Sequence, residues 1–113
     1  MVCLGGCSGA YSNTALPSSS AGFTGPTVFG FWDDLYLTSG TAQSVYYATS
    51  GTAPNRQLIF EYYTGLFGNT GSLHRFQIVF SENSPGIVII RYYQATSRGA
   101  SATIGVQRKF AMM

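Results

Sequence analysis

Six short runs of β-forming residues, separated by turn residues, constrain what this chain can fold into. They are rich in valine, isoleucine, phenylalanine, tyrosine and threonine, and they span residues 27–37, 43–49, 56–63, 73–82, 86–94 and 101–107. Glycine, proline, serine and asparagine lie between them. Short strands at this spacing indicate antiparallel hairpins, and no window repeats its apolar residues with the helical period. The sequence therefore predicts an all-β, antiparallel β-sandwich, jelly-roll-like, with little or no helix.

Alternation within the runs predicts the core, because successive strand residues point to opposite faces of a sheet. In each of the three central runs, apolar residues at alternate positions form a row on one face. Residues of the first and last runs join these three rows. The predicted core is Leu58, Phe60, Tyr62, Phe76, Ile78, Phe80, Val88, Ile90, Tyr92, Phe29, Phe31, Leu35, Leu37 and Ile104.

The opposite faces of these runs also carry apolar and aromatic side chains. A sheet that is apolar on both sides is covered on both sides. We therefore predict an assembly or binding surface that consists of Ile59, Tyr63, Val79, Ile89 and Tyr93. Outward tyrosines suit a protein interface or a stacking platform for sugar rings, and ordinary cross-strand packing is the third alternative.

The chain carries few charges, which excludes several classes of function. Charged residues are 9% of the sequence, against about 25% in ordinary soluble domains. With 45% hydrophobic and 15% aromatic residues the chain is not of the disordered type. A net charge of +2 without a basic cluster argues against nucleic acid as a partner. No apolar run is long enough for a membrane span.

The charges are also unevenly placed, since none precedes Asp33. Residues 1–26 are rich in serine, glycine and alanine and lack the basic and apolar segments of a signal peptide. We predict an uncharged N-terminal arm at 1–26, which lies against its own domain or a neighbouring molecule, and a β-sandwich domain at 27–113.

Asp33 and Asp34 are the only adjacent carboxylates. Neighbouring strand residues point apart, so the two cannot act together as a general acid and base. A partly buried Asp33 needs a partner, and Arg56 is the predicted one. Calcium at Asp33 and Asp34 is the alternative, because hard cations prefer oxygen ligands. We expect no other cofactor.

The cysteines and the single histidine complete the candidate chemistry. Cys3 and Cys7 are the only cysteines, and an even count in a small β-domain indicates a disulfide formed in an oxidising compartment. Its pairing within one chain or between two chains stays open. His74 at a strand start is expected to be a surface or capping residue. Without a convergent acid, base and nucleophile the chain is not expected to be an enzyme.

Six segments, in order, carry a family resemblance: Ala10-Tyr11-Ser12-Asn13-Thr14-Ala15-Leu16-Pro17-Ser18, Phe31-Trp32-Asp33-Asp34-Leu35, Val45-Tyr46-Tyr47, Gly51-Thr52-Ala53-Pro54-Asn55-Arg56, Phe76-Gln77-Ile78-Val79-Phe80 and Ala102-Thr103-Ile104-Gly105-Val106. From about residue 9 to 107 the chain resembles a NIDO-like, nidogen-type β-sandwich module of bacterial secreted and surface proteins. The resemblance implies an extracellular or cell-surface, non-enzymatic module used in adhesion or display. Strands usually precede these segments in the family, so it also implies a module shortened at its N-terminus.

These observations lead to two functional hypotheses. The preferred one is an extracellular structural or adhesive module that assembles with copies of itself, as a homo-oligomer or as a filament formed by arm or strand exchange. The alternative is a monomeric cell-surface module that binds a glycan or an extracellular protein through its outward tyrosines and loops.

Overall fold

The computed structural model describes residues 1–108, and these residues form eight strands and no helix. The strands are β1 (Val2–Cys3), β2 (Thr27–Trp32), β3 (Leu35–Tyr36), β4 (Ser44–Ser50), β5 (Gln57–Leu66), β6 (Asn69–Ser81), β7 (Val88–Ala95) and β8 (Thr103–Gln107). Within this part of the chain no helix has the length and apolarity needed to cross a membrane.

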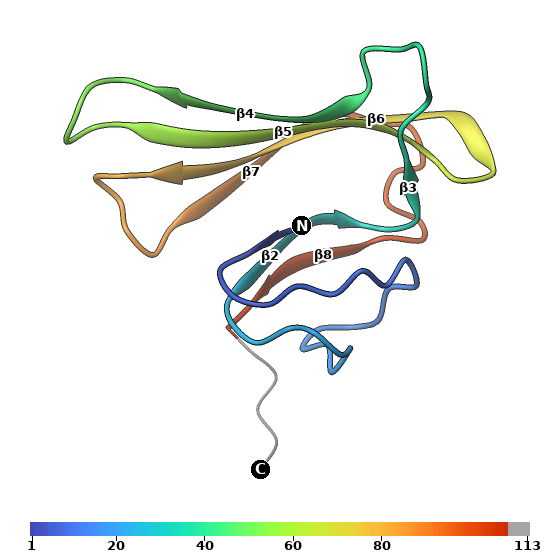
Figure 1. Cartoon of the computed structure of the whole chain (residues 1–113), viewed down its shortest axis with the longest axis horizontal. Helices are drawn as coiled ribbons and strands as arrows, with labels where there is room; N and C mark the ends of the chain where they lie inside the picture. The colour runs from blue at the N-terminus through green and yellow to red at the C-terminus, as the bar shows by residue number, and fades with distance from the viewer. Residues whose placement is uncertain (109–113) are drawn as a thin grey trace. The chain divides into compact units, whose positions relative to one another are not determined.

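The strands form two antiparallel sheets in two compact units (Figure 1). The first unit combines Met1–Leu35 with the C-terminal residues from Gly99 onward, and its sheet has the order β1-β2-β8. The second unit is Tyr36–Arg98, where β5, β6 and β7 follow one another and both β3 and β4 pair with β5. The predicted all-β, antiparallel class with little or no helix is confirmed.

The second unit is a succession of long hairpins, as the Val-, Ile- and Tyr-rich runs predict. β5 pairs with β4 from Gln57 to Tyr63 and with β6 along nearly its whole length. The rings of Tyr62 and Phe76 stack across this pair with centroids 4.7 Å apart. Burial raises the pKa of the Tyr62 hydroxyl to about 12, because the charged phenolate would lose its hydration there.

The predicted core is correct at its centre and wrong at its margins. Phe29, Phe31, Tyr62, Phe76 and Ile78 are buried. Half-buried positions are Leu35, Phe60, Phe80, Val88 and Ile90. Exposed positions are Leu37, Leu58, Tyr92 and Ile104. Alternation identifies the face on which a residue lies, but it does not show how far along the strand that face is covered.

Trp32 is a core residue that alternation misses. A register shift between Phe29 and Trp32 in the pairing of β2 with β8 breaks the alternation. As a result the two rings stack with centroids 5.1 Å apart, and Phe23 packs edge-on against both. These three buried aromatic residues are the centre of the first unit, with Leu16 against them.

The segment predicted as an arm is part of the first unit. Val2 pairs with Val28 in the sheet, and the indole N–H of Trp32 donates to the carbonyl of Ala10 at 2.9 Å. The Thr103 hydroxyl donates to the carbonyl of Thr14, also at 2.9 Å. Residues 1–26 therefore lie against their own chain, and the compact units divide near residues 35 and 98 rather than at residue 26.

Two residues of β8 receive the N-terminal segment. The buried Gln107 side chain accepts a hydrogen bond from the Ser18 N–H at 2.7 Å and donates to the Ser18 carbonyl at 3.4 Å. Gly105 has a φ of +153°, and a β-carbon there would lie 2.8 Å from Leu16 Cδ1. Glycine at position 105 thus leaves room for Leu16. The Gln107 side chain provides hydrogen-bond partners for the N–H and carbonyl groups of Ser18.

We expect Gln107→Ala to lower the free energy of unfolding by about 1–3 kcal/mol, because it leaves the buried Ser18 backbone groups without these partners. Urea denaturation measures the loss. Gln94→Ala, which truncates an exposed glutamine, should stay within about 0.5 kcal/mol of wild type. Equal stabilities of the two variants would contradict the prediction.

Candidate functional site

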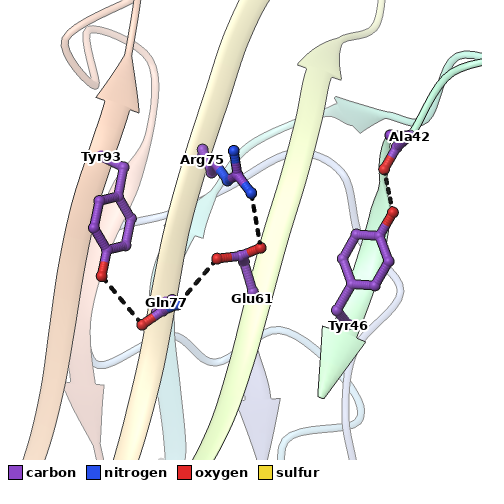
Figure 2. A network of polar contacts seen from close by, with 6 residues as sticks. All are labelled: Ala42, Tyr46, Glu61, Arg75, Gln77 and Tyr93. Carbon is purple, nitrogen blue, oxygen red and sulfur yellow. Dashed lines mark hydrogen bonds and ion pairs between the residues drawn. The ribbon is translucent and has the colours of Figure 1, made fainter. Parts of the chain in front are cut away.

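One row of side chains runs across four strands on one face of the sheet in the second unit. Tyr46 of β4 is in register with Glu61 of β5, Glu61 with Gln77 of β6, and Gln77 with Arg91 of β7. Two of these residues, Glu61 and Gln77, are joined with Arg75 and Tyr93 in a polar network, and Tyr46 has a separate contact with Ala42 (Figure 2). Antiparallel pairing brings them together although they are far apart in sequence.

Hydrogen bonds hold the centre of this row in place. The Glu61 carboxylate accepts from Gln77 Nε2 at 3.0 Å and from Arg75 Nη2 at 3.3 Å. Gln77 Oε1 accepts from the Tyr93 hydroxyl at 3.3 Å, and the Arg75 guanidinium lies 5.4 Å from the centre of the Tyr63 ring. Exposed ion pairs add little stability, so the main effect of the network is to orient Glu61 and Gln77.

A shallow depression of about 200 Å³ lies at the β4 end of the row. Its lining consists of Tyr46, Tyr47, Ala48, Ile59, Glu61 and Gln77. The Tyr46 hydroxyl donates to the backbone carbonyl of Ala42, which fixes the far end of that ring (Figure 2). The small side chain of Ala48 stands opposite Ile59. The depression therefore combines apolar and aromatic lining residues with two polar ones, Glu61 and Gln77.

The predicted assembly surface is only partly available to a partner. Tyr93 and Ile89 are exposed, and Ile59 and Tyr63 are half-buried. Val79 is fully buried, which corrects its prediction as a surface residue. It stands between Ile59 and Ile89 in register, and such cross-strand neighbours pack against one another.

The edges of this sheet differ in character. Within residues 1–108, β4 pairs only with β5, and its sequence SVYYATS has no charge, no proline and no register shift. Its residues from Val45 to Ser50 are all exposed, Tyr47 by 78%. On the other edge, β7 contains Arg91 and shifts its register opposite Arg75 and Phe76. Charges and bulges protect edge strands from further pairing, so β7 is protected and β4 is open.

The predicted ion pair between Asp33 and Arg56 is wrong, because both residues have other partners. Arg56 binds Glu82 with Nε–Oε2 and Nη2–Oε1 distances of 2.8 and 2.6 Å, and its backbone N–H donates to the same carboxylate at 3.1 Å. Asp33 accepts from the Ser101 hydroxyl at 2.6 Å and from the Asp34 N–H at 2.8 Å. Glu82 is far from Arg56 in sequence, and Ser101 is far from Asp33. The pairing of β5 with β6 and of β2 with β8 brings these residues close.

The two aspartates suggested for calcium lie in the turn between β2 and β3. One Asp33 oxygen accepts from a hydroxyl and the other from a backbone N–H. Among residues 1–108, no group of three or more histidine, cysteine or acidic side chains gathers where it could hold a metal ion. The strand parity assumed for Asp33 does not apply, because the residue follows the end of β2.

The other two predictions about reactive residues have different outcomes. Cys3 and Cys7 form the predicted disulfide, and they do so within one chain, with Cα atoms 5.6 Å apart. His74 is fully buried, which corrects its prediction as a surface or capping residue. Its Nε2 atom lies 2.8 Å from the Ser97 hydroxyl. The histidine is thus a packed residue of β6 and not an exposed acid or base.

The sequence does not single out Glu61, Arg75 and Gln77 as site residues, whereas one ring of the adjacent pair Tyr46 and Tyr47 is among the expected outward tyrosines. Alternation places Glu61 beside Ile59 and Tyr63 on the outward face, and Gln77 beside Val79. It does not indicate that Glu61 and Gln77 are directly opposite each other. That pairing depends on the register of β5 with β6.

The Arg56–Glu82 pair should make stability depend on pH. Its hydrogen bonds lower the pKa of Glu82 from 4.5 to about 2. Because the folded pKa is the lower one, this stabilisation is complete above pH 4.5 and is lost as the pH falls towards 2. We expect Glu82→Gln to remove this part of the acid loss in urea titrations at a series of pH values. An added salt should reduce the effect in wild type, and an identical pH slope in wild type and variant would contradict the assignment.

The comparisons with known proteins agree with the resemblance seen in the sequence. Searches among curated proteins and among solved structures gave no match. The family model described as NIDO related matches residues 4–113, nearly the whole chain. The chain therefore belongs to the NIDO-related family.

Proposed function

We propose that this protein is an extracellular, non-catalytic structural or adhesive module that associates with a second copy of itself through β4. The observation that carries the proposal is the open edge of β4. This strand has seven residues and no charge, and six of the seven residues are exposed. An edge strand of this kind presents unpaired N–H and C=O groups, which are a template for pairing with another strand.

The difference between the edges predicts the form of the assembly. Pairing of β4 with β4 of a second copy uses the same surface twice and closes as a symmetric dimer. Pairing of β4 with β7 would instead continue as a filament. The charge of Arg91 and the register shift in β7 oppose that second arrangement. We therefore favour the dimer over the filament.

The extracellular and non-catalytic parts of the proposal have separate support. The Cys3–Cys7 disulfide suits an oxidising compartment, and the family is typical of extracellular modules. Three of the four carboxylates are engaged in contacts with neighbouring residues: Asp33 with Ser101, Glu61 with Gln77 and Arg75, and Glu82 with Arg56. Such contacts favour structural roles over acid–base catalysis.

Analytical ultracentrifugation over about 1–100 µM tests the self-association, because a dimer with a micromolar Kd forms across this range. We expect wild type to pass from monomer to dimer. Tyr47→Lys should raise the dimer Kd by about tenfold or more, since it sets like charges against each other at the paired edges.

Ile87→Lys is the matched control, because it adds the same charge at an exposed apolar position outside the strands. It should dimerise like wild type. The proposal is overturned if wild type stays monomeric throughout the range, or if Ile87→Lys weakens the dimer as much as Tyr47→Lys does.

A further inference from the structure

We infer that the depression on the face of β4, β5 and β6 that carries Glu61 and Gln77 is a binding site for a sugar ring. The depression belongs to one copy of the chain and does not depend on self-association. Its lining combines apolar and aromatic residues with the polar side chains of Glu61 and Gln77. Neither family membership nor dimer formation requires this combination.

The chemistry of the lining matches that of a pyranose. A pyranose ring has apolar C–H faces and a rim of hydroxyl groups that both donate and accept hydrogen bonds. Tyr46, Ala48 and Ile59 offer a surface for the C–H face, and a tyrosine ring provides apolar contact area together with a polar edge. Glu61 is in register with both Tyr46 and Gln77, so its carboxylate and the Gln77 amide can meet hydroxyl groups of a ring that lies on Tyr46.

The two polar residues have hydrogen-bonding capacity left for a ligand. A carboxylate has about four acceptor positions and an amide group has two donor hydrogens and an acceptor oxygen. Glu61 accepts two hydrogen bonds from the protein, and Gln77 Nε2 donates one. A hydroxyl group can therefore accept from Gln77 while a neighbouring hydroxyl donates to Glu61.

The site is preorganised, because its polar side chains are already held before a ligand arrives. Arg75 and Tyr93 fix Glu61 and Gln77 from either side, and the contact with Ala42 fixes Tyr46 (Figure 2). Fewer rotamers are then lost on binding, which favours affinity. The volume of about 200 Å³ is below that of sites for drug-sized molecules and suits a single ring.

Two-dimensional ¹H–¹⁵N NMR with glucose, galactose, mannose, N-acetylglucosamine and their β-1,4-linked disaccharides tests the inference. A shallow site that covers one face of a ring should give a Kd on the order of 1 mM. At least one of these sugars should cause saturable shifts at residues 46–48, 59–61 and 77.

The variants separate contact with the sugar from damage to the fold. Gln77→Ala should weaken binding about fivefold or more through the lost hydrogen bond, whereas Gln94→Ala on the exposed part of β7 should bind like wild type. Tyr46→Ala should also lose binding, and Tyr46→Phe, which keeps the ring but removes the hydroxyl that donates to Ala42, should lose less. A dispersed spectrum shows that each variant is folded.

The inference is overturned if none of the sugars gives saturable shifts, or if the shifts lie outside the depression. It is also overturned if Gln94→Ala loses as much affinity as Gln77→Ala, or if Tyr46→Ala binds as well as Tyr46→Phe. The comparison of Tyr46→Ala with Tyr46→Phe still tests the inference if Gln77→Ala disturbs the sheet.

Discussion

The pairing of β5 with β6 is the interaction on which the second unit depends. On one face it stacks Tyr62 on Phe76, and on the other it places Glu61 opposite Gln77. One register thus builds a buried aromatic contact on one face and a half-buried polar pair on the other. A slip by one residue would exchange the two faces, so stability and the candidate site are both functions of this register.

The first unit holds in place an N-terminal segment that has no charged side chain. The segment brings Phe23 to the rings of Phe29 and Trp32, and its backbone polar groups find partners on β2 and β8. Gln107 supplies two of these hydrogen bonds from a single side chain. Burial of apolar side chains and hydrogen bonds to backbone groups therefore hold this segment, which has no charged side chains for ion pairs.

The low charge has a second consequence at the edge of the other sheet. Most proteins place a lysine, a proline or a bulge on an edge strand, and β7 follows this rule with Arg91 and a register shift. β4 does not follow it, although Tyr47 is largely exposed there. An open edge of this kind is tolerated where pairing is part of the function, which is why we place self-association at β4 and not at β7.

Composition and alternation alone determined the all-β class, the approximate strands, the presence of a disulfide and the centre of the core, because these depend on local pattern, whereas the structure decided that Cys3 pairs with Cys7 of the same chain. Tertiary structure alone decided the burial of Trp32, Val79 and His74 and the partner of Arg56. The physical reason is register: a bulge reverses alternation, and strand pairing selects which distant side chains meet. The contact between Glu61 and Gln77 also depends on register. The face of each residue follows from alternation in the sequence, but their pairing does not.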